Sequence, residues 1–266
     1  MEDCFGRKIT YLRISVTDRC NLRCRYCMPE EGVKLLDRSM ILSYKEIDDF
    51  TRIAVEMGID KVRVTGGEPL VRKNIVSLIE NLSSIDGIKD LSMTTNGVLL
   101  SEYADDLKKA GLKRINISLD TVDADRYREI TRGGDINRVL EGISAAKRVG
   151  FNPIKLNCVV EKDSSEESAL GVAEYALVEN LSVRYIPLMD LKSGVFGRVE
   201  GGDGGNCSEC SRLRLTATGM LKPCLFNNIE FSIRELGASK AIELALKHKP
   251  HKGGNNSTGC FYNIGG

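Results

Sequence analysis

The sequence has no excess of charge of either sign, no tryptophan and no long hydrophobic run. Its 38 Lys and Arg residues are balanced by 37 Asp and Glu residues, which argues against a polybasic nucleic-acid-binding surface and against an acidic tail. The N-terminal MEDCFGRKIT lacks the apolar stretch of a signal peptide, and no apolar run is long enough to span a membrane. We therefore expect a cytoplasmic protein that binds neither nucleic acid nor a membrane.

A chain of 266 residues can bury one large core. Strand patterns alternate with helix patterns up to about residue 190, which predicts parallel βα units in either an open sheet or a barrel. The expected strands cover residues 9–16, 61–65, 88–94, 114–119, 154–160 and 183–188, and the expected helices cover 43–58, a segment ending near 82, 101–110, 123–130, 136–149 and 165–178.

The pattern changes after Met189. Residues 193–206 are rich in glycine and predict a flexible link, and the segment from Cys207 predicts a separate small element with one helix over about 232–247. We predict an α/β fold in two parts, a partial (βα)6 TIM-like barrel over residues 1–190 and a C-terminal extension over 191–266.

Polar side chains recur at every second position of the expected strands, so that each set lies on one face of its strand. A sheet with one solvated face would also give this pattern, but the helical segments are amphipathic and need sheet surface to cover. We favour a barrel with a wet, polar lumen. Its inward cations would be Arg13, Arg63 and Lys155, with Arg184 as a fourth candidate, and they call for an anionic ligand such as a polyphosphate.

The chemical motifs begin where these strands end. They are Cys20 after the first strand, Gly66-Gly67-Glu68-Pro69 after the second, Thr94-Thr95-Asn96-Gly97 at the third, Ser118-Leu119-Asp120 at the fourth and Met189 after the sixth. Active sites of βα barrels lie at the C-terminal ends of the strands, and we expect the active site there.

Six of the nine cysteines form two triplets, Cys20-x3-Cys24-x2-Cys27 and Cys207-x2-Cys210-x13-Cys224. Clustered cysteines in a cytoplasmic protein are more often metal ligands or catalytic groups than disulfides. A structural zinc site takes four ligands, whereas three thiolates on a [4Fe–4S] cluster leave one iron open to a small molecule. Two triplets therefore suggest two clusters that each hold a reactant.

The first triplet, with Tyr26 before its last cysteine, resembles the cluster loop of the radical S-adenosylmethionine (SAM) superfamily, and Gly66-Gly67-Glu68-Pro69 resembles its GGEP motif. A zinc or redox-sensing loop is the alternative. The resemblance implies a [4Fe–4S] cluster on Cys20, Cys24 and Cys27, whose open iron binds the amino and carboxylate groups of SAM and whose electron cleaves SAM to a 5′-deoxyadenosyl radical. It further implies SAM contacts from Tyr26, Gly67, Ser118 and Met189.

The second triplet, with the run Arg212-Leu213-Arg214, resembles the auxiliary-cluster motif of the GTP 3′,8-cyclase family, as does the run from Leu12 to Asn21. Members perform the first step of molybdenum cofactor biosynthesis. The resemblance implies a second [4Fe–4S] cluster on Cys207, Cys210 and Cys224 that binds guanine. It implies GTP contacts from Arg13, Arg63, Thr94, Lys155, Arg212, Leu213 and Arg214, and catalytic roles for Arg13, Arg212, Arg214 and the C-terminal Gly265 and Gly266.

In this family the adenosyl radical would abstract the ribose 3′ hydrogen of GTP, and the carbon radical would attack C8. Addition of one electron and one proton to the cyclised radical would then give (8S)-3′,8-cyclo-7,8-dihydroguanosine 5′-triphosphate. The family also implies a reductase or flavodoxin-like electron donor and functional coupling to cyclic pyranopterin monophosphate synthase. The state of assembly, monomer or homodimer, stays open. The link between Met189 and Cys207 is several dozen residues shorter than in familiar members.

Two alternatives remain. One is a radical SAM maturase that acts on a peptide and uses its second cluster for electron transfer. The other is a non-catalytic metal-binding protein with structural zinc at both triplets. Three cysteines, Cys4, Cys158 and Cys260, belong to neither triplet, and we expect Cys158 to be a small buried hydrophobic residue.

Overall fold

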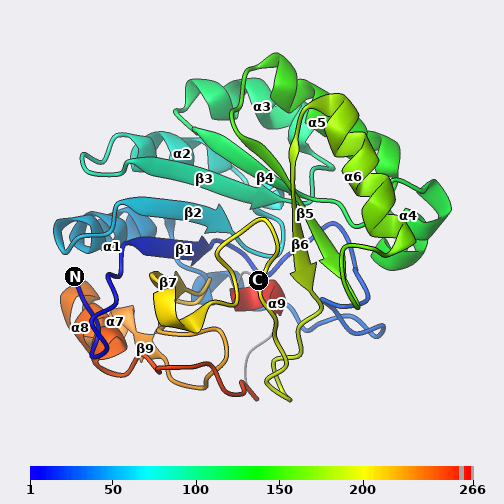
Figure 1. The fold of residues 1–266 in the computed structure, drawn as a ribbon. Coiled ribbons are helices and arrows are strands. Elements are labelled where there is room, and N and C mark those ends of the chain that lie inside the picture. The colour runs from blue at the N-terminus through cyan, green and yellow to red at the C-terminus, as the bar shows by residue number, and fades with distance from the viewer. Residues whose placement is uncertain (258–260, 265–266) are drawn as a thin grey trace.

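One sheet runs through the whole molecule in the computed structural model, which describes residues 1–257 and 261–264. Its strand order is β6-β5-β4-β3-β2-β1-β7-β8-β9, and strands β1 to β6 are parallel and adjacent in chain order. Their bounds are β1 Tyr11–Ser15, β2 Lys61–Thr65, β3 Asp90–Thr95, β4 Arg114–Ser118, β5 Ile154–Val160 and β6 Ser182–Pro187. The sheet is curved but open, with β6 and β9 at its edges, so the expected α/β partial barrel is confirmed (Figure 1).

Helices cover the convex face of this sheet (Figure 1). Their bounds are α1 Tyr44–Glu56, α2 Ile75–Ser83, α3 Leu100–Lys109, α4 Ala124–Thr131, α5 Ile136–Arg148 and α6 Glu167–Glu179. The first begins at a capping box, because the Ser43 side chain accepts from the Glu46 amide while the Glu46 side chain accepts from the Ser43 amide. Helix α3 begins at Leu100, one residue before the start of the helix expected over 101–110.

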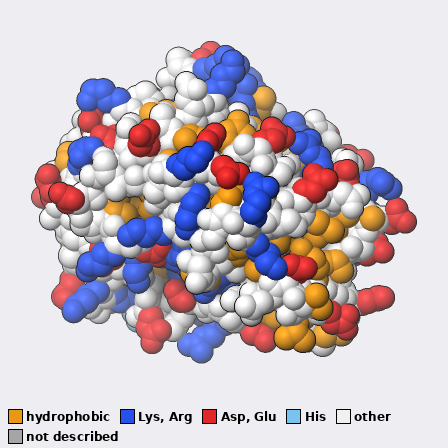
Figure 2. Space-filling model, turned by 90° about the horizontal axis from the view of Figure 1, so that it is seen from above, with side chains coloured by type: hydrophobic (Ala, Val, Ile, Leu, Met, Phe, Trp, Pro, Cys, Tyr) orange, Lys and Arg blue, Asp and Glu red, His pale blue; other side chains and the backbone are white. Residues whose placement is uncertain are grey.

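The core lies between the helices and the sheet. Alternate strand residues such as Leu12, Ile14, Val62 and Val64 are fully buried against apolar helix faces, which leaves the polar strand residues on the concave side. On the outside, acidic and basic side chains are interspersed over the helices (Figure 2). No helix within the described ranges is long and apolar enough to cross a membrane.

The C-terminal extension continues the same sheet. Strand β7, Arg212–Leu215, pairs in parallel with β1, and β8, Met220–Lys222, and β9, Phe231–Ser232, follow as antiparallel neighbours. The element expected to stand apart therefore shares the barrel's sheet, and the division of the chain at residue 190 stays a prediction.

The prediction of a single helix over residues 232–247 is wrong, because the structure has two helices there. Gly237, with φ of 75° and ψ of 161°, separates α7, Ile233–Leu236, from α8, Ala238–Lys247, because this backbone conformation interrupts the helical hydrogen bonds. A last short helix, α9, Phe261–Ile264, returns to the concave side of the sheet (Figure 1).

Candidate active site

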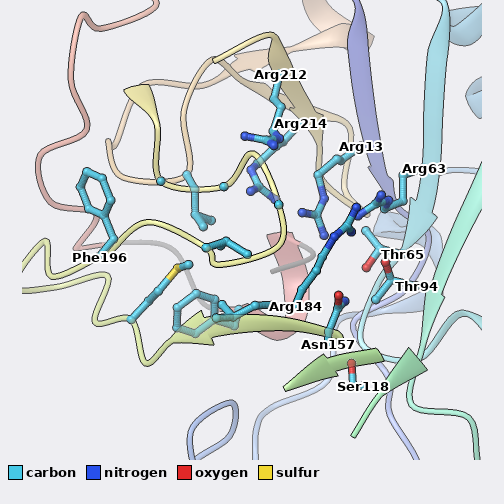
Figure 3. Close-up of a pocket in the computed structure, with 18 of the residues that line it drawn as sticks. Arg13, Arg63, Thr65, Thr94, Ser118, Asn157, Arg184, Phe196, Arg212 and Arg214 are labelled. Carbon is cyan, nitrogen blue, oxygen red and sulfur yellow. The ribbon is translucent and has the colours of Figure 1, made fainter. Parts of the chain in front are cut away.

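A cavity of about 540 Å³ lies on the concave side of the sheet, lined by all six barrel strands, by the link after β6 and by the extension (Figure 3). Almost all residues singled out in the sequence line it. They are the six triplet cysteines Cys20, Cys24, Cys27, Cys207, Cys210 and Cys224, the expected SAM contacts Tyr26, Gly67, Ser118 and Met189, and the expected GTP contacts Arg13, Arg63, Thr94, Lys155, Arg212 and Arg214. Two groups far apart in the sequence thus share one chamber.

Three of the expected site residues are not among the described residues that line the cavity. Leu213 is 1% exposed and belongs to the apolar core, so its side chain does not line the cavity, and a contact with GTP would have to come from its backbone. Gly265 and Gly266 lie outside the described residues. Just before them, Phe261 lines the cavity and Ile264 packs with Leu191, Leu225 and Phe226.

Arginines from three neighbouring strands form a row across the sheet. Arg13 on β1 lies opposite Arg63 on β2 and opposite Arg214 on β7. Burial and the neighbouring Arg214 hold the pKa of Arg13 well below its usual value, and burial together with Arg212 lowers the pKa of Arg214 to about 10. Like charges directly opposite each other destabilise a sheet. The row therefore favours a polyanionic ligand that would bridge it.

Figure 3 shows Arg13, Arg63 and Arg184 converging on one part of the cavity, with Arg212 and Arg214 directed toward it from the extension. Burial lowers the pKa of Arg63 and of Arg184 as well. The expectation that the four cations Arg13, Arg63, Lys155 and Arg184 share one polar chamber is confirmed, since all four line this cavity.

Some buried polar atoms on the cavity wall have no hydrogen-bond partner among the described residues. They include Thr94 Oγ1, Asn157 Oδ1 and Arg184 Nε. Buried polar groups are normally hydrogen-bonded, so these atoms mark positions that a polar ligand would satisfy.

The first cysteine loop is held by the Gly66-Gly67-Glu68-Pro69 turn. The Gly67 amide donates to the Thr17 carbonyl over 2.7 Å, and the Glu68 amide donates to the Arg19 carbonyl over 2.8 Å. A Cβ on Gly67 would lie 2.3 Å from the Arg19 carbonyl oxygen, so only glycine fits. Glycine is thus required at position 67 because the backbone of this turn lies so close to the backbone that leads to Cys20. This requirement holds without any bound ligand.

The Glu68 carboxylate fixes the next strand end. It accepts from the Thr95 hydroxyl and the Asn96 amide, each over 2.7 Å, and from the Leu70 amide over 2.9 Å. Complete burial raises its pKa to about 7, against the lowering effect of these hydrogen bonds. Asn96 in turn donates to the Cys20 sulfur over 3.7 Å, which links the loops after β1, β2 and β3.

Two buried aspartates, Asp18 and Asp120, have structural partners. Asp120 accepts from the Tyr26 hydroxyl over 2.7 Å and from the Val159 amide over 2.8 Å, and Asp18 accepts from the Leu36 amide over 2.7 Å. These contacts position the first cysteine loop, and the hydrogen bond from Tyr26 orients its ring against the cavity.

The donor set fits iron–sulfur clusters. All six triplet cysteines are thiols on the cavity wall, and thiolates are the ligands that such clusters take. Burial, and then Asp120, raises the pKa of Cys24 to about 12, so a cationic iron centre is needed to hold it as a thiolate. Within the described ranges, no three His, Cys, Asp or Glu side chains gather closely enough to hold a single metal ion.

Sequence reasoning missed several lining residues. Tyr11, Lys61 and Arg114 line the cavity, and each falls on the same alternate positions as its strand's recognised polar residues, so the signal was present. Phe196 and Asp203 also line it, but they lie in the link expected to be merely flexible.

The link instead packs on the edge of the sheet. Tyr185 of β6 and Glu200 exchange backbone hydrogen bonds of 3.1 and 3.0 Å. Phe196 stacks on Phe226 of the extension with ring centroids 4.5 Å apart, and the Asp203 carboxylate lies 3.7 Å from the Arg212 guanidinium. The link thus forms one wall of the cavity. Of the cysteines outside the triplets, Cys158 is fully buried, as expected, Cys4 is exposed and Cys260 lies outside the described residues.

Comparison with known proteins agrees with this geometry. Residues 14–176 match the family described as the radical SAM superfamily. The GTP 3′,8-cyclase of Alkaliphilus metalliredigens is 41% identical over 301 residues, which covers 94% of this chain and 94% of that protein. The chain belongs to the GTP 3′,8-cyclase family of the radical SAM superfamily.

A second relative, the GTP 3′,8-cyclase of Thermodesulfovibrio yellowstonii, is 45% identical over 287 residues, covering 91% of this chain and 89% of that protein. Both alignments are longer than the chain itself, so these members of the GTP 3′,8-cyclase family carry segments that it lacks, in keeping with its short link. Among solved structures, anSMEcpe with bound AdoMet has a TM-score of 0.65 at 15% identity, covering 91% of this chain and 82% of that one. At this identity the likeness shows a common fold.

Proposed function

We propose that this protein is a radical SAM GTP 3′,8-cyclase that converts GTP to (8S)-3′,8-cyclo-7,8-dihydroguanosine 5′-triphosphate, the first step of molybdenum cofactor biosynthesis. One observation carries the proposal: two cysteine triplets and a row of buried arginines line a single cavity in a chain 41% identical to a GTP 3′,8-cyclase. Its cofactors are SAM and two [4Fe–4S] clusters.

Cys20, Cys24 and Cys27 hold the first cluster, and Cys207, Cys210 and Cys224 hold the second. When bound, the first cluster and SAM supply the 5′-deoxyadenosyl radical that removes the ribose 3′ hydrogen. Tyr26, Gly67, Ser118 and Met189 line the cavity, and in this proposal they contact SAM.

The triphosphate of GTP spans the cationic row. Arg13, Arg63, Lys155 and Arg214 neutralise its charge, and the hydroxyl of Thr94, buried without a partner in the described chain, gains one from the substrate. The cavity wall formed by the link and α9 excludes water from the reacting carbon. Gly265 and Gly266 follow α9 in the sequence, and their catalytic role is part of this proposal.

We further propose that the protein acts in the cytoplasm, receives electrons from a reductase or flavodoxin-like donor, and is functionally coupled to cyclic pyranopterin monophosphate synthase. Membership of the GTP 3′,8-cyclase family supports this setting. Monomer and homodimer are both compatible with the proposed site, which one chain completes by itself.

The test is anaerobic reconstitution with iron and sulfide, followed by incubation with SAM, a reductant and GTP deuterated at the ribose 3′ position. We expect the cyclic product and 5′-deoxyadenosine in equal amounts, with the deuterium in the 5′-deoxyadenosine. Intact GTP beside newly formed 5′-deoxyadenosine would contradict the assigned substrate.

A matched pair of cysteine variants tests whether cyclisation requires the second cysteine triplet. Cys224→Ser removes a thiol of the second triplet and is expected to abolish cyclisation and to lower the iron content. Cys4→Ser changes an exposed cysteine outside both triplets and is expected to behave like the unaltered protein. Zinc in place of iron, without iron–sulfur absorption, would favour the non-catalytic alternative.

A further inference from the structure

A buried lysine lies beside the second cysteine triplet. Lys249 follows α8 and is 3% exposed. Its ammonium donates to the Arg212 carbonyl over 2.7 Å and to the Pro223 carbonyl over 2.6 Å. Arg212 stands two positions after Cys210, and Pro223 directly precedes Cys224. One buried cation therefore ties together the two backbone segments that carry these thiols.

The charge of this ammonium also acts on the thiols of the second triplet. An ammonium has three donors, and two of them reach the Arg212 and Pro223 carbonyls. Cys210 and Cys224 both interact electrostatically with the Lys249 side chain. Lys249 thus interacts with the ligand atoms as well as with the backbone.

Other buried cations of this region have a different arrangement. Arg7 donates to the Cys207 carbonyl over 2.7 Å, but its guanidinium is paired with Asp3 over 2.6 Å. Lys222 is 1% exposed and pairs with Glu230 over 3.0 Å. Their charges are offset by carboxylates, whereas Lys249 donates to two backbone carbonyls and interacts electrostatically with two thiols of the second triplet.

We propose that Lys249 is a positioning residue for the second cluster: it holds the Cys210 and Cys224 segments in place and raises the reduction potential of the cluster that they ligate. A buried positive charge stabilises the reduced, more negative form of a nearby cluster. Net charge and hydrogen bonds to the sulfurs are known to set such potentials. The inference rests on the proposed function only in requiring a [4Fe–4S] cluster at the second triplet.

The test is a redox titration of the reconstituted full chain followed by electron paramagnetic resonance. The signal of the second cluster is assigned by its loss in Cys224→Ser. Lys249→Met removes both the charge and the donors, and Lys249→Gln removes the charge but keeps an N–H donor. In both, we expect the ratio of reduced to oxidised second cluster at a fixed potential to fall about tenfold, which corresponds to about 59 mV for one electron.

Lys222→Met is the matched control, because it removes a buried lysine of the same extension whose partner is a carboxylate. We expect it to leave the potential of the second cluster unchanged. Selective loss of iron from the second triplet in the Lys249 variants would support the holding role. An unchanged potential with full iron in both Lys249 variants would overturn the proposal, as would equal iron loss in all three variants.

Failure of this inference can be told apart from failure of the proposed function. A shifted potential in a chain that leaves GTP intact would refute the cyclase activity and support the role of Lys249. A wild-type chain that assembles no iron–sulfur cluster at the second triplet would overturn both.

Discussion

Arg13 of β1 and Arg214 of β7 lie directly opposite each other on neighbouring parallel strands, although two hundred positions separate them in the chain. This pair joins the barrel to the C-terminal extension and extends the cationic row that begins at Arg63. The row places like charges side by side in a buried wall, and their repulsion destabilises the unliganded fold. The same charges increase the affinity of the site for a polyanion. The first prediction tests both effects.

Arg63→Gln is expected to weaken GTP binding about tenfold or more, because a buried guanidinium facing the triphosphate is lost. The same change is expected to raise the melting temperature of the unliganded protein, since repulsion within the row falls. Equilibrium binding and thermal unfolding measure the two effects. Arg52→Gln, which changes an exposed arginine paired with Asp48, serves as the control and should change neither. A melting temperature lowered by Arg63→Gln would contradict the repulsion.

Asp203→Asn is expected to strengthen GTP binding about two- to fivefold. The Asp203 carboxylate lies 3.7 Å from Arg212 and competes with the substrate for this cation. The effect is small because the Asp203 side chain is 89% exposed and its pairing is screened by water. Asp190→Asn changes another acidic residue of the link, one that contacts Ser193, and is the matched control. Equal affinities in both variants would exclude competition by Asp203.

Gly67→Ala is expected to destabilise the protein by about 2 kcal/mol and to lower the iron content of the first cluster. The new Cβ would meet the Arg19 carbonyl oxygen at 2.3 Å and displace the backbone that leads to Cys20. Gly254→Ala is the control, since a Cβ there meets no atom within 4 Å. Urea unfolding and iron analysis measure the effect, and a Gly67→Ala protein with full iron and stability would show that the loop can move without cost.

Arg234→Met is expected to lower the free energy of unfolding at pH 7 by less than about 1 kcal/mol, because the Glu46–Arg234 pair is partly exposed. The hydrogen bond from Arg234 lowers the pKa of Glu46 to about 2, below its value of about 4.3 in the unfolded chain. The stabilisation is therefore present above pH 4.3 and is lost as the pH falls through 2.

Urea unfolding of both proteins at a series of pH values measures this difference, which should shrink between about pH 5 and pH 2. Arg128→Met removes an exposed pair with Asp125 on α4 and provides the comparison. A difference that stays constant over this range would show that Arg234 acts through packing rather than through the charge of Glu46.

Much of the site could be predicted from local sequence. Alternation with period two is a property of each strand by itself, so it placed Arg13, Arg63 and Lys155 on the lumen side without knowledge of their neighbours. The cysteine spacings likewise lie within short segments, and the strand ends at Cys20 and Ser118 follow from the strand pattern. These features survive in any fold that keeps the six strands parallel.

Local sequence patterns did not predict the features that depend on contacts between distant segments. The break at Gly237 was missed because glycine within a helical pattern is tolerated, and only the packing of the extension required its positive φ here. The link was read as flexible because its glycines carry no periodic signal. Its hydrogen bonds to Tyr185 and the stack of Phe196 on Phe226 form only once β6 and the extension are in place.

The family, the two thiol triplets and the faces of the barrel strands could be recognised from short stretches of sequence, since each depends on a few neighbouring residues. The three-dimensional fold, in contrast, sets the pairing of β7 with β1, through which Arg214 completes the row begun by Arg13 and Arg63. It also decided that Lys249 lies between the segments of Cys210 and Cys224. Contacts between such distant segments result from packing across the whole core, and no short stretch of sequence specifies which segments meet.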